Sequence, residues 1–143
     1  MSRGVATSSF RARYSETDQM GVVYHAHYLV WCEIARTELI RHLGTPYAEL
    51  ERAGVFLVVA DAHVRYIAAA RYDDWIRVEA RLERVQSRAV TFAYEIAREK
   101  DGRLERLATA TTKLIALDEH GSPRTLPTSL LRTFGDVLGA QTT

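Results

Sequence analysis

The order of hydrophobic patterns along the chain predicts an α+β domain in which an antiparallel sheet wraps around one long helix. Residues 25–43 repeat apolar side chains every three or four positions, as an amphipathic helix does. After this stretch the pattern changes to the alternation typical of strands, with short turn signals between them. Successive hairpins make a sheet antiparallel, and a single dominant helix buries its apolar side against that sheet.

The long helix is expected from His25 to Leu43. Gly44 follows its last apolar residue and Pro46 comes two positions later, which are the residues that commonly end helices. A short second helix is expected from Pro46 to Ala53. The apolar stripe of the long helix consists of Tyr28, Trp31, Cys32, Ala35, Leu39 and Leu43.

Five strands are expected, and the clearest alternates Ile76, Val78, Ala80 and Leu82 with charged residues. Gln86-Ser87 and Asp101-Gly102 are the turn signals on either side of the fourth strand. The C-terminal stretch Thr128–Leu138 can form a further helix. The expected strands are Phe10–Tyr14, Val55–Tyr66, Ile76–Glu83, Val90–Ile96 and Leu104–Leu117.

Length and composition predict one domain spanning residues 1–143 and exclude several classes of protein. The 143 residues carry 19 Lys and Arg against 18 Asp and Glu, so the basic excess of a nucleic-acid binder is absent. Cys32 is the single cysteine, which excludes an intramolecular disulfide and fits a reducing compartment. Neither a secretory signal nor a membrane-spanning apolar run is evident, and a cytoplasmic location is therefore expected.

The segment from Tyr14 to Tyr28 contains the residues expected to carry chemistry. It places Asp18, then Gly21, then Tyr24 and His25 at the opening of the predicted helix. A helix start leaves backbone N–H groups unpaired and carries partial positive charge, so it can stabilise a developing oxyanion. Asp18 is close enough in sequence to approach the same carbonyl group from another side.

Thioester hydrolysis suits this small set of groups. A thiol has a pKa of about 8.5, so the thiolate leaves without strong acid assistance, whereas an amine leaving group needs a general acid. One carboxylate and a few N–H groups are then sufficient. Taken alone the pattern is weak, because an Asp before a helix is more often a cap or turn residue.

The run Tyr14-Ser-Glu-Thr-Asp-Gln-Met-Gly-Val-Val-Tyr-His-Ala-His-Tyr28, followed by Trp31-Cys-Glu-Ile-Ala-Arg-Thr-Glu38, resembles the signature of the 4-hydroxybenzoyl-CoA thioesterase family. That family includes the Tol-Pal-associated acyl-CoA thioesterases. The similarity continues through Ala70–Asp74 to Leu126-Pro127 and so covers nearly the whole chain. The chain departs from many members in having Ala70 in place of Pro and His27 in place of Asn.

The resemblance implies a hotdog fold, a five-stranded antiparallel sheet around a central helix, with active sites at a dimer interface. It implies that Asp18 is the catalytic aspartate and that Tyr24 and His25 lie at the thioester carbonyl. CoA would be part of the substrate rather than a cofactor, with Arg71 and Arg88 as candidates for binding its phosphates. A homodimer or homotetramer is therefore expected.

Other interpretations stay open for several of these residues. His25 can act through its imidazole or only through its backbone N–H, and His27 is expected to be a pocket wall or interface residue. No metal site is expected, because histidines two positions apart on a helix point to different faces. For the whole chain, the alternatives are an acyl carrier protein-linked thioesterase, a scaffolding module, or a hydratase on the same fold.

Overall fold

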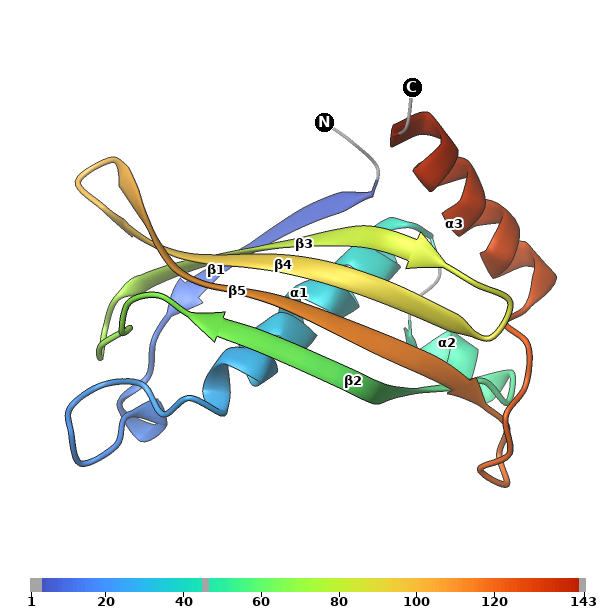
Figure 1. Cartoon of the computed structure of the whole chain (residues 1–143), viewed down its shortest axis with the longest axis horizontal. Helices are drawn as coiled ribbons and strands as arrows, with labels where there is room; N and C mark the ends of the chain where they lie inside the picture. The colour runs from blue at the N-terminus through green and yellow to red at the C-terminus, as the bar shows by residue number, and fades with distance from the viewer. Residues whose placement is uncertain (1–3, 45–46, 142–143) are drawn as a thin grey trace.

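The computed structural model describes residues 4–44 and 47–141 as a five-stranded antiparallel sheet with one long helix against one face (Figure 1). The strand order is β1-β3-β4-β5-β2. Strands β3, β4 and β5 follow one another as hairpins, and β1 and β2 form the two edges. The strands are β1 (Val5–Arg11), β2 (Phe56–Tyr66), β3 (Trp75–Val85), β4 (Ala89–Lys100) and β5 (Arg103–Leu117).

The helices lie between the strands and at the end of the chain. A single 3-10 turn, η1 (Tyr14–Glu16), follows β1. Helix α1 (His27–His42) is the long helix, and α2 (Tyr47–Arg52) is a short one after it. Helix α3 (Thr128–Gln141) packs beside β3 at the end of the sheet where α1 ends (Figure 1).

The core is formed between α1 and the inner face of the sheet. The predicted apolar stripe of α1 is confirmed, because all six of its residues are buried: Tyr28, Trp31, Cys32, Ala35, Leu39 and Leu43. The alternation of β3 is confirmed as well: Ile76, Val78, Ala80 and Leu82 are buried, while Arg77 and Glu79 lie on the other face. This arrangement is the hotdog architecture that the sequence predicts.

The expected first strand, Phe10–Tyr14, is wrong in its position, because β1 runs from Val5 to Arg11. Thr7, Ser8 and Ser9 lack the apolar alternation of a strand, yet each pairs with a residue of β3. After β1 the chain turns into η1, where the side chain of Tyr14 is 76% exposed. Tertiary pairing therefore decided the position of this strand against the local pattern.

The helix boundaries differ slightly from those predicted. Helix α1 begins at His27 rather than His25, because the residues before it form tight turns in which His27 N–H donates to the Tyr24 carbonyl at 3.0 Å. Pro46, the expected start of the second helix, lies outside the described residues. Among the helices of the described ranges, none is long and apolar enough to cross a bilayer.

The hairpin between β4 and β5 has the predicted turn residues. Asp101 and Gly102 have φ values of 55° and 75°. Both are in the left-handed region, as the common two-residue hairpin turn requires, and glycine adopts it at little cost. The Asp-Gly signal in the sequence therefore identified this turn correctly.

Removal of core packing on α1 should destabilise the fold strongly. Leu39 is fully buried, so we expect Leu39→Ala to lower the free energy of unfolding by about 2–5 kcal/mol. Leu104→Ala is the matched control, because Leu104 is 54% exposed on β5 and should cost less than about 1 kcal/mol. Urea unfolding followed by circular dichroism measures both. Equal losses would contradict the placement of the core.

Candidate active site

Asp18 lies in a short loop whose ends are tied together. The backbone of Thr17 pairs with that of Val23, and Asp18 N–H donates to the Val22 carbonyl at 2.9 Å. Residues 17–23 form this turn, hereafter the Asp18 loop. Gly21 closes it with φ at 81°, a left-handed conformation that a residue with a Cβ adopts only with strain. Backbone hydrogen bonds and Gly21 thus fix the conformation of the loop and the position of Asp18 in it.

The carboxylate of Asp18 is half-buried and only partly engaged. Its Oδ1 accepts a hydrogen bond from Met20 N–H at 2.9 Å. In the described part of the chain no hydrogen bond reaches Oδ2. One oxygen therefore fixes the side chain, while the other is available to a reactant.

Most backbone N–H groups at the start of α1 already have acceptors, but two do not. Tyr24 N–H donates to the Glu16 carbonyl at 2.9 Å, and Tyr28 N–H donates to the His25 carbonyl at 3.3 Å. The N–H groups of His25 and Ala26 donate to no acceptor within residues 4–44 and 47–141. Of the two amides expected at a thioester carbonyl, the one of Tyr24 is occupied and the one of His25 is open.

Aromatic side chains surround this helix start. The rings of Tyr24 and His25 lie 4.4 Å apart between centroids, and the His25 ring meets that of Tyr66 at 6.3 Å. The Tyr66 hydroxyl, at the end of β2, donates to the His25 carbonyl at 2.8 Å. His27 is half-buried, with its ring 6.3 Å from Tyr24. The last residue of β2 therefore fixes the backbone at His25.

The connection between β2 and β3 supports the other side of the Asp18 loop. Ala70 is fully buried; its carbonyl accepts Val23 N–H at 2.8 Å, and its N–H donates to the Tyr28 hydroxyl at 2.9 Å. The carboxylate of Asp74 accepts Arg98 Nη1 at 2.7 Å and so anchors this connection to β4. Segments far apart in the sequence thus meet at the same end of α1 (Figure 1).

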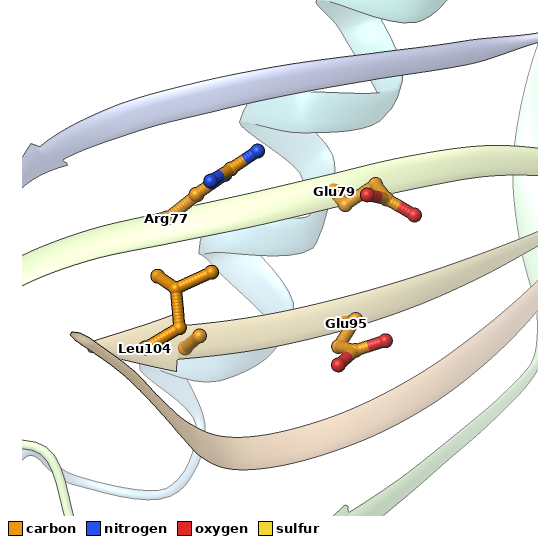
Figure 2. Close-up of a pocket in the computed structure, with 5 residues that line it drawn as sticks. Arg77, Glu79, Glu95 and Leu104 are labelled. Atoms are coloured by element: carbon orange, nitrogen blue, oxygen red, sulfur yellow. The ribbon is translucent and has the colours of Figure 1, made fainter. Parts of the chain in front are cut away.

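A separate hollow of about 100 Å³ lies on the face of the sheet that points away from α1 (Figure 2). Glu79 and Glu95 occupy directly opposed positions on β3 and β4 there. Glu95 is bonded to Arg106 at 3.0 Å. No residue of the Asp18 loop lines this hollow, which is lined by Arg77, Glu79, Glu95, Ala97 and Leu104. It therefore does not belong to the candidate site.

Residues 12–134 match the model of a protein family described as the thioesterase-like superfamily. The chain belongs to this superfamily. The match covers η1, the Asp18 loop, α1 and all strands but β1. It confirms the resemblance to thioesterases that the sequence shows.

Named relatives and a solved structure agree with this assignment. The acyl-CoA thioester hydrolase YbgC of Escherichia coli O6:H1 is 32% identical over 125 residues, 87% of this chain and 91% of that protein. The putative acyl-CoA thioesterase YneP of Bacillus subtilis is 39% identical over 92 residues, 64% of this chain and 67% of that protein. The crystal structure of a DHNA-CoA thioesterase from Staphylococcus aureus has a TM-score of 0.90 at 29% identity, covering 96% of this chain and 93% of that one.

The two arginines predicted to bind phosphate lie at different ends of the thioesterase. Arg71 is exposed in the β2–β3 connection, at the same end as the Asp18 loop. Arg88 is exposed in the β3–β4 turn, at the other end of β3, and a strand of 11 residues is roughly 35 Å long. Within one chain the structure brings Arg71, but not Arg88, toward Asp18.

Glu16 and Tyr66 are site residues that the sequence analysis missed. Glu16 is buried below the Asp18 loop, with 3% of its surface exposed, and Tyr66 fixes the backbone of His25. The spacing of Arg13 and Glu16, three positions apart before a turn, was an available signal for a capping contact. No local signal marks Tyr66, because its role depends on where β2 ends relative to α1.

Cys32 of the thioesterase is a core residue rather than a nucleophile. It is fully buried on α1, and this burial raises the pKa of its thiol to about 12. Burial also raises the pKa of the Tyr28 and Tyr94 hydroxyls. Within the described residues no three His, Cys, Asp or Glu side chains are grouped as metal ligands.

The raised pKa of Cys32 predicts loss of stability in alkali. Below pH 9 the Cys32 thiol is protonated in both the folded and the unfolded protein. Above pH 9 the thiol ionises in the unfolded chain, while in the folded protein it keeps its proton until about pH 12. We therefore expect the free energy of unfolding to fall as the pH rises through this range, and Cys32→Ala to make that decline shallower. Urea unfolding of both proteins between pH 7 and about pH 10.5 measures it. Identical slopes would show that the thiol is not responsible.

Proposed function

We propose that this thioesterase hydrolyses acyl-CoA thioesters to the free carboxylic acid and CoA, with Asp18 as the catalytic carboxylate. One observation carries the proposal: a partly free carboxylate oxygen and open N–H groups belong to the same short segment at the start of α1. The relatives named as acyl-CoA thioesterases support the choice of substrate.

The open amides of His25 and Ala26 would bind the thioester oxygen. That oxygen gains negative charge when the carbonyl carbon is attacked, and preorganised N–H groups stabilise this charge more than the ground state. The partial positive charge of the helix start adds to the effect. Because Tyr24 N–H is engaged by Glu16, the His25 and Ala26 amides are the proposed oxyanion donors.

Asp18 would attack or activate water through Oδ2. As a general base, the carboxylate takes a proton from water, the hydroxide adds to the carbonyl carbon, and the tetrahedral intermediate expels the CoA thiolate. As a nucleophile, Asp18 forms a mixed anhydride with release of the thiolate, and water then hydrolyses the anhydride. Both routes yield the same acid and CoA, and neither calls for a metal or a cofactor.

The remaining residues of the site would bind and orient the substrate. The exposed rings of Tyr24 and Tyr66 flank the helix start and offer apolar surface to the acyl group. Arg71 would bind CoA phosphate at this end of its own chain. Arg88 lies too far from Asp18 of the same chain, so it would serve a site of a neighbouring subunit.

We propose that the thioesterase works as a homo-oligomer in which a second copy covers β2. This edge strand is 11 residues long and mostly exposed, including the apolar side chains of Val58 and Val59. The exposed face of α1 adds Val30 and Ile34. A long edge strand with apolar side chains invites association unless another strand covers it. An identical edge can pair with itself antiparallel around a twofold axis.

Asp18→Asn should abolish turnover, because the amide cannot act as a base or form an anhydride. We expect kcat to fall at least about 10³-fold, while the fold stays intact because an amide oxygen can still accept the Met20 N–H. Thiol release from a panel of aromatic, short-chain and long-chain acyl-CoA measures the loss and ranks the acyl groups.

The same panel presented on acyl carrier protein tests the alternative carrier. Asp136→Asn is a control, since Asp136 is exposed on α3, away from the β2 edge, and takes no part in the proposed chemistry. If only the carrier-protein thioesters were turned over, acyl carrier protein rather than CoA would be the carrier of the substrate. No turnover on either carrier by a folded protein would contradict the proposed activity and favour a scaffolding role.

A charge placed on the β2 edge should separate the subunits. Val59 is 49% exposed, and Val59→Lys would set two like charges against each other across the proposed twofold axis. We expect a lower molar mass in light scattering coupled to size-exclusion chromatography, together with reduced turnover. Leu104→Lys on the outer sheet face is the matched control. An unchanged mass for Val59→Lys would place the interface elsewhere.

A further inference from the structure

Glu16 is a buried carboxylate beneath the Asp18 loop, and the proposed reaction does not use it. We propose that Glu16 is a positioning residue that holds Asp18 at a fixed distance from the open amides of the helix start. The proposal rests on the function proposed above. Glu16 and Thr112 are the buried polar residues of the described chain, and Glu16 is the charged one.

The side chain of Glu16 joins the start of the loop to the core of α1. Its Oε1 accepts Arg13 N–H at 2.7 Å, and its Oε2 accepts Trp31 Nε1–H at 2.9 Å. Trp31 is itself buried among the core residues of α1, so it cannot shift without repacking. Through these bonds Glu16 links the loop directly to the helix whose start would bind the oxyanion.

The backbone of Glu16 adds a second link to the same helix. Its carbonyl accepts Tyr24 N–H at 2.9 Å, and the next residue, Thr17, pairs with Val23. The segment that leads to Asp18 and the segment that leads to α1 are thereby held side by side. Asp18 follows two residues after Glu16, and His25 follows directly after Tyr24. The two halves of the proposed site thus share one anchor.

This anchor also determines which amides remain open. Because Tyr24 N–H is bound by Glu16, the amides left for a substrate oxygen are those of His25 and Ala26. If Glu16 moved, Tyr24 N–H would be released and the carboxylate of Asp18 would shift relative to all of these groups. Misplacement of a reacting group by about 1 Å can cost roughly 10²-fold in rate.

A carboxylate suits this position better than an amide. Two N–H donors converge on its oxygens, and the Arg13 guanidinium lies 3.6 Å away as a countercharge. A carboxylate offers acceptors only, whereas glutamine would present its own N–H donors to one of the two N–H groups. Glu16 cannot serve as the base instead of Asp18, because both of its oxygens are bonded and buried.

Glu16→Gln in the whole chain tests the proposal. We expect kcat to fall about 10- to 100-fold while KM changes less than about threefold, because the substrate contacts stay in place. Hydrogen exchange should be faster at the Tyr24 amide and unchanged in the β3–β4 hairpin. Trp31→Phe, which removes the indole donor, should also lower kcat, and the double variant should lose less than the product of the separate losses.

Thr112→Val is the control for simple destabilisation. It removes the other buried polar group, whose hydroxyl is hydrogen-bonded to the Tyr94 hydroxyl at 2.6 Å and makes no bond to the Asp18 loop. We expect this variant to have a lower melting temperature but a kcat within about twofold of the unmodified protein. Unchanged kcat and Tyr24 exchange in Glu16→Gln would overturn the positioning role while leaving the thioesterase activity intact. An equal loss of kcat in Thr112→Val would overturn it as well. Absence of turnover in the unmodified protein would overturn both proposals.

Discussion

The apolar side of α1, packed against the inner face of the sheet, determines where the helix begins and therefore where its open amides point. Trp31, Cys32, Ala35 and Leu39 leave almost no surface exposed, so the helix can neither rotate nor slide without creating cavities. Bonds from Tyr66, Ala70 and Glu16 then connect the surrounding loops to this helix. The proposed chemistry uses little more than a carboxylate and backbone amides, so its precision depends on this packing.

Hydrogen bonds at the site supplement that packing by connecting the loops to residues of the core. Each loop near Asp18 is tied to a buried residue: the Asp18 loop to Trp31 through Glu16, and the β2–β3 connection to Tyr28. The half-buried Arg98 holds the β2–β3 connection as well, through Asp74. A buried polar group left without its hydrogen-bond partner raises the free energy of the folded state. Movement of either loop away from its buried partner is therefore unfavourable. These bonds therefore hold the proposed catalytic groups in place relative to one another.

Much of the fold could be predicted because its signals are local. The stripe of α1, the alternation in β3 and the Asp101-Gly102 turn depend on neighbouring residues, and each was identified correctly. The position of β1 was not predicted, since Thr7 to Ser9 become a strand only by pairing with β3. Asp18, Tyr24 and His25 could be proposed as site residues because they are close together in the sequence. Glu16 and Tyr66 were missed because their roles arise from contacts with α1 that no short pattern encodes.

The strand order also has a consequence for how the molecule folds. Strands β3, β4 and β5 are joined by tight hairpins, whereas β1 and β2 reach their partners only through long detours of the chain. Contacts between neighbours in sequence form early, and closure of long loops delays the rest. The central meander can therefore form before either edge is added. Since the Asp18 loop follows β1 and Tyr66 ends β2, the proposed site is complete only when both edge strands have joined the sheet.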